Sequence, residues 1–523
     1  MDRAARVAVT ALALAGCKPE LPPLGEAVLV VDTDLPVPML AGELRIDLYT
    51  VDPASGGAER WYQSRTLALP DPRDWPVSFS VFNPDDEGRR EALVRLRTYP
   101  RGRLRDYRGE RFLPPPAPSL PLDAPYRPPE APVDEGPRLV VDGVDVTPAA
   151  EPQPGVTVDR LVKVALAEGE VGQVEVTLRG DCVGTMADLF GARSCEATER
   201  VLAPIADAVL EPRSSALPSV QGSFWPSEGC TDTPPPPSGA PYHDERVCVP
   251  GGAFIFGNLE AFGIAEASGV PERFVALPPF WIDRYEVTVA RLRRAYAEGL
   301  AKVDDTPTVN DEPFDPAAEP NAPTFCTYTT APGPREDHPV NCVSRATAES
   351  FCRFLGGELP SEAQWEYVAQ VAGRDRETPY PWGVSEPRCD TVVYAVVDAG
   401  VSAVLGGNKC VAPDKSNVGP APVTRFSHEG GDVSIGLGVV GLGGNVHEHV
   451  RDDFLALDTV FWIGAPLRSP VCVVDSPLAK SMRGGAWSAN ASVVYSGLRN
   501  KYLVGDSDLF TTLGFRCVWP ATP

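Results

Sequence analysis

Basic charge and long apolar runs are scarce in this sequence. Its 47 lysines and arginines are outnumbered by 71 aspartates and glutamates, which gives a formal charge of −24. An acidic surface repels phosphate, so nucleic acid is not an expected partner. The apolar run 7–15 is too short to cross a bilayer and no later run is long enough, which excludes a membrane-spanning helix. The N-terminal half contains no nucleotide-binding loop, nucleophile elbow or heptad repeat, so it shows no chemistry of its own.

The length and the prolines indicate several domains joined by linkers. A chain of 523 residues is too long for one ordinary core and predicts roughly two to four domains. Its hydrophobic content of 43% is sufficient for globular folding. The 57 prolines are about twice the average usage. Because they cluster, we predict proline-rich linkers at 114–137 and 213–244.

Alternating apolar and polar residues predict an all-β N-terminal region. Residues 25–113 are expected to form a β-sandwich-like domain, with turn residues between its strands. A second β segment at 138–212 can complete the same sandwich, since the first alone offers few strands. The strand-like runs are 27–31, 44–49, 77–82, 92–97, 161–166 and 174–178. A binding sandwich and a structural spacer both fit this region.

The first seventeen residues have the pattern of a targeting segment. Arg3 and Arg6 precede the short apolar run, which ends in Leu14-Ala15-Gly16-Cys17. Small residues before a cysteine resemble the lipobox of bacterial lipoproteins, in which the cysteine is diacylated and becomes the new N-terminus. Cys17 is therefore the expected lipidation site, and a plain secretory signal is the alternative. Lys18 favours the outer membrane, so we expect a cell-envelope protein, periplasmic or surface-exposed.

A series of short motifs runs through the C-terminal half. They are 249–254 (VPGGAF), 280–288 (FWIDRYEVT), 338–344 (HPVNCVS), 359–367 (LPSEAQWEY), 380–383 (YPWG), 444–449 (GNVHEH), 483–487 (RGGAW) and 514–517 (GFRC). Each motif is weak alone, but in this order they resemble the formylglycine-generating enzyme (sulfatase-modifying factor) family. The resemblance implies that 245–521 is an α+β domain with a C-type-lectin-like fold. The predicted chain is thus multidomain, with an all-β sandwich-like N-terminal region followed by this module.

Three of these motifs also have local physical interpretations. Ser361 is expected to cap the helix that carries Glu362 and Trp365. Gly484-Gly485 permits close backbone approach in an irregular core. Arg516 is interpreted as the partner in a buried ion pair rather than as a catalyst.

The twelve cysteines are suited to a loop-rich module that needs covalent cross-links. Without the lipidated Cys17 eleven remain, so at least one thiol is unpaired or intermolecular. The family pairs a first-helix cysteine with the one in its last motif, which implies Cys352 with Cys517. Cys326 and Cys342 flank a short loop and are expected partners. The other local pairs are Cys389 with Cys410, Cys182 with Cys195, and Cys230 with Cys248, which leaves Cys472 over. Such disulfides are typical of an oxidising, extracytoplasmic compartment.

The family's catalytic positions are altered in this sequence. The resemblance implies two cysteines that bind Cu(I), three and eight residues before an arginine, here Arg499. Those positions are Ser496 and Ala491. A hydroxyl and a methyl group cannot replace two thiolates. No catalytic residue is therefore assigned, and copper is not expected as a cofactor.

Two histidines stand where the family has tryptophans in its active cleft. His447 and His449 take these places, and the other cleft candidates are Asn445, Trp487 and Arg499. The simpler interpretation is surface drift, since a change from tryptophan to histidine removes a cleft wall.

Metal binding is the alternative interpretation of these histidines. They would share one face of a strand and Asp452 and Asp453 follow, but no zinc-hydrolase motif is present. Family members also hold calcium here, through a glutamate, in this chain Glu448, and through a side chain four residues before the asparagine. That position is Gly441, so a Ca2+ site would be weak or empty.

These observations favour a lipid-anchored, extracytoplasmic binding or scaffold protein whose family module does not catalyse. Its expected partners are the membrane, through the lipid anchor, and a peptide, protein or glycan ligand. Two alternatives are kept. A divergent oxidase acting on a protein cysteine would need thiols at 491 and 496. A His-dependent metalloenzyme centred on His447 and His449 would need bound metal.

Overall fold

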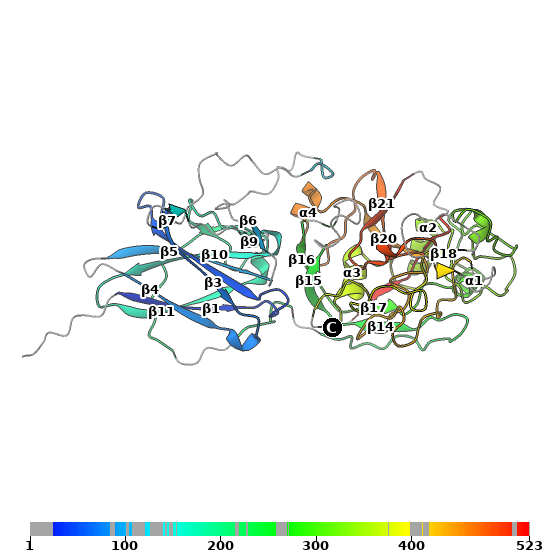
Figure 1. Cartoon of the computed structure of the whole chain (residues 1–523), viewed down its shortest axis with the longest axis horizontal. Coiled ribbons are helices and arrows are strands. Elements are labelled where there is room, and N and C mark those ends of the chain that lie inside the picture. The colour runs from blue at the N-terminus through cyan, green and yellow to red at the C-terminus, as the bar shows by residue number, and fades with distance from the viewer. Residues whose placement is uncertain are drawn as a thin grey trace, which may run out of the picture.

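The computed structural model contains two β-rich parts that lie side by side along its long axis (Figure 1). It describes residues 25–521 except 84–88, 101–103, 107–120, 126–139, 142–143, 146–149, 153, 215–218, 226–227, 258–268, 270, 375, 398–409, 412–417 and 505–509. The expected lipidation site Cys17 and most of the proline-rich stretch 114–137 lie outside these residues. No described helix is long and apolar enough to cross a membrane.

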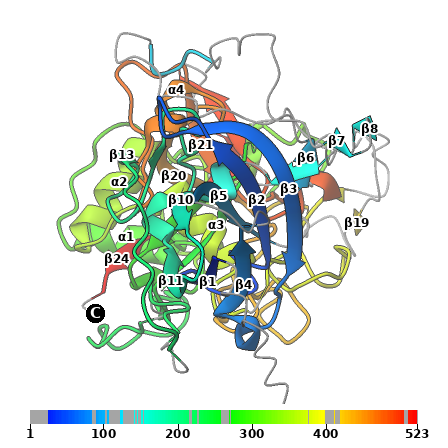
Figure 2. The same ribbon diagram turned by 90° about the vertical axis from the view of Figure 1, so that its left-hand side faces the viewer.

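The N-terminal part is a sandwich of two sheets, which faces the viewer in Figure 2. One sheet has the order β11-β1-β4 and the other β10-β5-β2-β3. These strands are β1 (Glu26–Thr33), β2 (Glu43–Val51), β3 (Ala58–Ala68), β4 (Val77–Phe82), β5 (Arg90–Tyr99), β10 (Val158–Leu166) and β11 (Val171–Leu178). The short pairs are β6 (Leu104–Asp106) with β9 (Ala150–Pro152), β7 (Val140–Val141) with β8 (Val144–Asp145), and β12 (Arg193–Ser194) with β13 (Ala203–Pro204).

The second β segment completes the sandwich instead of forming a unit of its own. Its strand β11 pairs in parallel with β1, and β10 pairs antiparallel with β5, so each sheet receives one strand from it. All six strand-like runs of the sequence lie within these strands. The strand β3 was not expected from the sequence. It is an edge strand, and most of its side chains are exposed, so its residues show no apolar alternation.

In its described residues, the C-terminal module combines four α-helices with small sheets. Its sheets are β14-β17-β24, β15-β16, β18-β19 and β22-β21-β20-β23. The strands are β14 (Arg246–Val249), β15 (Gly252–Phe256), β16 (Arg273–Leu277), β17 (Phe280–Asp283), β18 (Val396–Val397), β19 (Cys410–Val411), β20 (His447–Asp453), β21 (Ala479–Arg483), β22 (Asn500–Leu503), β23 (Leu513–Gly514) and β24 (Val518–Pro520). The helices are α1 (Val289–Ala297), α2 (Arg345–Phe354), α3 (Glu362–Gln370) and α4 (Val460–Gly464).

The expected helix cap and glycine contacts are confirmed. The Ser361 hydroxyl accepts from the Gln364 amide at 3.1 Å, and the Gln364 side chain accepts from the Ser361 amide at 2.9 Å. This reciprocal arrangement satisfies two amides at the start of α3. Gly484 has a φ of +80°, and a Cβ atom on Gly485 would lie 2.3 Å from the Gly443 carbonyl oxygen, so neither position has room for a side chain.

The two parts share one apolar core at their junction. Leu29, Val31 and Val176 of the sandwich belong to the same buried cluster as Ile255 and Phe274 of the β15–β16 hairpin. That hairpin lies between the sandwich and the rest of the module in Figure 1. An ion pair of 3.0 Å between Arg468 and Asp181 also crosses the junction. The sandwich is therefore packed onto the module rather than tethered to it.

The stretch 213–244, predicted as a proline-rich linker, packs against the fold in its described part. Phe224 is buried in the shared core, and its amide donates to the Asp34 carbonyl at 2.9 Å. The indole of Trp225 donates to the Leu277 carbonyl, and Cys230 is joined to Cys248. Two large aromatic side chains supply enough apolar surface to hold a proline-rich stretch against the fold.

The structure contains five disulfides, in the pairing expected from the sequence. They are Cys182–Cys195, Cys230–Cys248, Cys326–Cys342, Cys352–Cys517 and Cys389–Cys410. Among the described cysteines, Cys472 is free and buried.

Candidate functional site

The motif 444–449 leads directly into β20, the strand that carries both histidines. β20 lies between β21 and β23, and α3 packs against β20 and β21. Its side chains therefore enter the interior: His449 and Glu448 are 0% exposed and His447 is 8% exposed. Surface drift is wrong as an explanation of the histidines, because both are core residues.

Both histidine rings are held as neutral hydrogen-bonding groups. The His447 Nδ1 lies 2.6 Å from the Gly484 carbonyl oxygen, and the His449 Nε2 lies 3.0 Å from the Val343 carbonyl oxygen. The second ring nitrogen of His449, Nδ1, forms a hydrogen bond with the Tyr502 hydroxyl, whose oxygen lies 3.2 Å away. Burial lowers the pKa of both imidazoles to about 4. A neutral His449 with both nitrogens engaged has no lone pair to offer a metal.

We expect the purified chain to retain less than stoichiometric zinc or copper after dialysis. Across the described residues, no three His, Cys, Asp or Glu side chains gather in a way that could hold a metal ion. Elemental analysis by plasma mass spectrometry is the measurement, with a His447→Ala/His449→Ala chain as the control. One metal per chain in the parent protein, absent from the double variant, would contradict the expectation.

Glu448 is committed to Arg516 instead of to calcium. The Arg516 Nε lies 2.7 Å from Oε2 and its Nη2 lies 2.6 Å from Oε1, while the Trp365 indole donates to Oε2 at 2.9 Å. Both charged side chains are almost completely buried, which confirms the ion pair expected for Arg516. With these acceptors in use and no side chain at Gly441, the residues do not fit a Ca2+ site that needs six to eight oxygens.

Glu286 fills the space beside Gly441. A Cβ atom on Gly441 would lie 2.9 Å from a carboxylate oxygen of Glu286, and Glu286 itself is fully buried. Burial raises its pKa well above the usual range, and the nearby Arg516 only partly offsets this. Asp432 accepts from the Gly443 and Gly444 amides at 3.0 Å, and burial raises its pKa to about 7. This part of the interior contains more carboxyl groups than cations, so burial favours the neutral, protonated forms of Glu286 and Asp432.

Arg499 lies in a second buried ion pair rather than in a cleft. Its Nε and Nη2 contact the two carboxylate oxygens of Glu362 at 3.1 and 2.5 Å, and its Nη1 donates to the Leu455 carbonyl at 2.8 Å. Next to it, Arg483 pairs with Glu366. All four side chains are 0% exposed. These pairs tie α3 to the β21–β22 region, which makes Arg499 a structural residue.

The two expected copper positions carry no suitable donor. Ala491 is half-buried and packs against the aromatic cluster of Tyr380 and Tyr394. Ser496 is buried, and its hydroxyl donates to the Ala369 carbonyl at 3.4 Å. A soft Cu(I) ion needs thiolate ligands, so these residues do not fit the metal.

Cys472 cannot stand in for a copper ligand. It is 0% exposed within the core under α3, and its amide donates to Asp452 at 2.7 Å. Burial and the neighbouring carboxylates Asp452 and Glu362 raise the pKa of its thiol. A buried thiol of this kind stays protonated and unreactive.

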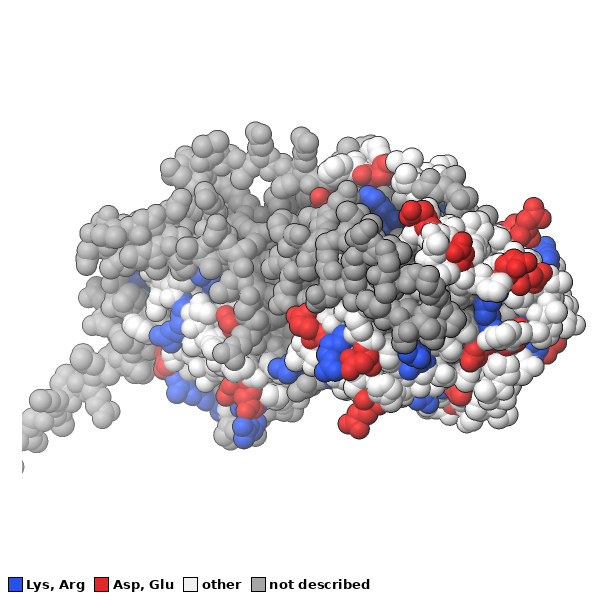
Figure 3. All heavy atoms as spheres, turned by 45° about the vertical axis from the view of Figure 1, so that its right-hand side comes forward, with Lys and Arg blue, Asp and Glu red and all other residues white. Residues whose placement is uncertain are grey.

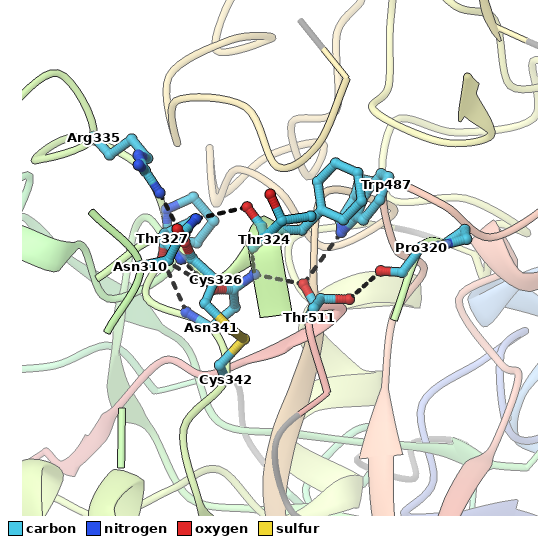
Figure 4. Close-up of a disulfide and its surroundings, with 12 residues drawn as sticks. Asn310, Pro320, Thr324, Cys326, Thr327, Arg335, Asn341, Cys342, Trp487 and Thr511 are labelled. Atoms are coloured by element: carbon cyan, nitrogen blue, oxygen red, sulfur yellow. Dashed lines mark hydrogen bonds between the residues drawn. A yellow bond between two sulfur atoms is a disulfide. The ribbon is translucent and has the colours of Figure 1, made fainter. Parts of the chain in front are cut away.

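Asn445 and Trp487 lie together beside the Cys326–Cys342 disulfide. The Trp487 amide donates to the Asn445 carbonyl at 2.7 Å. The Trp487 indole donates to the Thr511 carbonyl at 3.2 Å and its ring lies 4.7 Å from that of Phe325. Figure 4 shows how Asn341, the residue before Cys342, donates to the same Thr511 carbonyl. The contacts fix the loop 310–342 over Trp487 and leave this indole 1% exposed.

The five cleft candidates are therefore core residues, and only some of them meet. Asn445 contacts Trp487 through the backbone. His447 contacts the Gly484 carbonyl instead, and Arg499 pairs with Glu362. Sequence reasoning missed the buried acids Glu286 and Asp432. The signal for Glu286 was its place between Tyr285 and Val287 in the motif 280–288; Asp432 had none.

Comparison with known proteins agrees with the motif order. The model of the sulfatase-modifying factor enzyme 1-like domain matches residues 233–521. A formylglycine-generating enzyme of Thermomonospora curvata is 30% identical over 312 residues, which are 52% of this chain and 92% of that protein. One from Mycobacterium tuberculosis is 25% identical over 318 residues, 52% of this chain and 97% of its own length.

Solved structures with similarity cover about half of the chain. PvdO from Pseudomonas aeruginosa is 21% identical with a TM-score of 0.35 and covers 52% of this chain and 93% of its own. CarF is 16% identical with a TM-score of 0.35 and covers 53% of this chain and 98% of its own. From the family match over more than half of its length, the chain belongs to the sulfatase-modifying factor enzyme 1-like family.

Proposed function

We propose that this chain is a lipid-anchored, extracytoplasmic binding or scaffold protein whose family module does not catalyse. The module keeps the structural motifs of its family in an α+β domain, for which a C-type-lectin-like arrangement is the expected form. Its ligand would be a peptide, a protein or a glycan. The anchor would hold the module and its sandwich at the outer membrane.

The lack of a thiol pair carries the non-catalytic part of this proposal. The sequence has no cysteine between Cys472 and Cys517. Cys517 is in a disulfide and Cys472 is buried with a raised pKa. Ala491 and Ser496 stand where thiolates would be needed, so a dithiolate copper site cannot form.

We expect no conversion of a substrate cysteine to formylglycine. Purified chain is incubated with copper, oxygen and a cysteine-containing sulfatase-type peptide, and the products are weighed by mass spectrometry. The yield should equal that of a mixture without protein. Repeated turnover above this background would favour the divergent oxidase instead.

A gain-of-ligand variant is the complementary trial. Ala491→Cys with Ser496→Cys adds two thiols, so its affinity for Cu(I) should rise above that of the parent chain even without activity. The matched control is Ala491→Ser, which alters one of the same two positions without adding a thiol.

Lipidation at Cys17 is the second part of the proposal. Its support is the ending Leu14-Ala15-Gly16-Cys17 after a short apolar run, together with a set of disulfides typical of an oxidising compartment. We expect Cys17→Ser to move the protein from the membrane fraction to the soluble fraction. A Cys17→Ser chain that stays membrane-bound after a salt wash would show that the anchor lies elsewhere.

The metalloenzyme alternative has little support from the side chains. His449 uses both ring nitrogens in hydrogen bonds, and His447 is held by the Gly484 carbonyl. The two rings would have to break these contacts before they could bind zinc.

A further inference from the structure

An apolar hollow lies on the module surface at the outer end of β21 and β22. It has a volume of about 660 Å³. Leu478, the most exposed large apolar side chain of the described residues at 80%, lines it together with Leu503, which is 52% exposed. Leu122 also lines it and is 47% exposed. Exposed apolar side chains gathered in one place mark an interaction site more often than scattered ones.

The sheet itself makes the floor of this hollow. Ala479 of β21 pairs with Leu503 of β22, and the Phe454 amide donates to the Ala479 carbonyl at 3.0 Å. The Lys501 ammonium lies 5.1 Å from the centre of the Phe454 ring. The loop 474–478 forms one wall. The floor is therefore built on paired strands and keeps its shape without a ligand.

The other wall is a short proline-rich peptide of the same chain. The Val460 and Phe461 amides donate to the Ala124 and Leu122 carbonyls, each at 3.1 Å. Pro125 forms an isolated bridge with Thr459. This segment, 121–125, lies beside α4 in Figure 1. The module thus already holds one extended peptide at this place through backbone hydrogen bonds, and the hollow continues that interface.

The rim of the hollow is acidic. Asp123, Asp458 and Asp475 line it, are exposed and make no ion pair within the described part of the chain. Lys501 is the one basic residue among the described lining residues. Figure 3 shows acidic and basic side chains interspersed on the visible surface, and the formal charge of −24 favours the same sign of partner at long range.

We propose that this hollow binds an extended segment of a partner protein that carries leucine, valine or proline side chains flanked by lysine or arginine. The apolar side chains would cover Leu478, Leu503 and Phe454, and the cations would face the three aspartates. Anionic lipid headgroups would be repelled by that rim, which favours a peptide over a membrane surface. The proposal gives the chain a partner class and stands whether or not the module catalyses.

The test uses the full chain in mild detergent and two labelled twelve-residue peptides. One repeats Lys-Pro-Leu, and the other has glutamate in place of each lysine. Measured by fluorescence anisotropy, the affinity for the basic peptide should be about tenfold higher than that for the acidic one. The affinity for the basic peptide should fall as the salt concentration is raised. Leu478→Asp with Leu503→Asp should lower the affinity for the basic peptide about tenfold.

Matched controls separate the hollow from general attraction to an acidic protein. Val209→Asp changes a side chain that is 71% exposed on the sandwich and should leave peptide affinity unchanged. Asp458→Asn with Asp475→Asn should reduce both the affinity and its salt dependence. Circular dichroism and thermal melting of each variant check that the fold is retained.

Two results would overturn the proposal. One is equal affinity of the parent chain and the Leu478→Asp/Leu503→Asp chain for the basic peptide. The other is a Cys17→Ser chain that sediments with phosphatidylcholine vesicles and loses this on the same double substitution, which would assign the hollow to a membrane. Neither result bears on the oxidation assay, so the two proposals fail independently.

Discussion

Removal of the Cys352–Cys517 disulfide is expected to lower the free energy of unfolding by about 5 kcal/mol. The bond joins residues 165 apart, the longest separation of the five disulfides in the described residues. The cost of a missing cross-link grows with the length of the loop that it closes, because the unfolded chain regains more conformations. Both sulfurs are also buried in the core between α1, α2 and the motif 514–517, so their loss leaves a packing defect.

The measurement is urea unfolding of Cys352→Ala/Cys517→Ala under non-reducing conditions. The matched control is Cys389→Ala/Cys410→Ala, which opens a separation of 21 residues and should lose about 3 kcal/mol. A larger loss in the control than in the long-range pair would contradict the loop-length argument. Alkylation of Cys352 or Cys517 in the parent chain without prior reduction would show that the bond is absent.

The substitution Arg516→Met is expected to cost about 3–5 kcal/mol of stability. The guanidinium neutralises Glu448, lies near Glu286, and donates to the carbonyls of Asp283 and Val440. Without it, a fully buried carboxylate loses its cation and must be desolvated or protonated.

The loss should deepen as pH rises. The Arg516 guanidinium partly offsets the raised pKa of Glu286, so its removal should raise that pKa further. A carboxyl group of this kind stabilises the fold below the unfolded pKa, and this stability is lost as pH rises through the folded pKa. Urea midpoints of parent and variant, measured from pH 5 to pH 8, should therefore diverge.

Further variants test whether the effect belongs to the buried pair. Arg388→Met removes a surface pair with Asp390, in which both side chains are more than 60% exposed, and should leave the free energy of unfolding nearly unchanged. Adding Glu448→Gln to Arg516→Met removes the orphaned charge and should recover part of the stability, whereas adding Glu286→Gln should remove most of the pH dependence. An Arg516→Met/Glu286→Gln chain as pH-sensitive as Arg516→Met would contradict this assignment.

Local patterns in the sequence predicted much of the secondary structure. Strands such as β2 and β5 were evident because side chains alternate between two faces of a sheet with a period of two. The start of α3 was evident because Ser361 has the residue type and position of an N-cap. The order of eight motifs gave the family of the C-terminal half, the resemblance implied Cys352 with Cys517, and proximity in sequence gave the four local disulfide pairs. These features depend on residues close in sequence or on a pattern shared with relatives.

The site was less accessible to the same reasoning. Ala491 and Ser496 already indicate the loss of copper ligands, because ligand chemistry follows from residue type. The interpretation of His447 and His449 as surface drift failed, because burial depends on what packs over a strand. Here α3, Val343 and Tyr502 cover them, and these come from distant parts of the chain.

The sequence by itself determined the family, the altered copper positions, six strands of the sandwich and the start of α3, since these rest on local spacing and side-chain chemistry. The tertiary structure alone decided that the sandwich and the module share a core, that Phe224 and Trp225 hold the proline-rich stretch in place, and that Arg499 is a buried ion-pair partner of Glu362. It also decided that Leu122, Leu478 and Leu503, far apart in sequence, line one hollow. Burial and proximity arise from long-range packing, and no local pattern of residues encodes which distant surface will cover a given side chain.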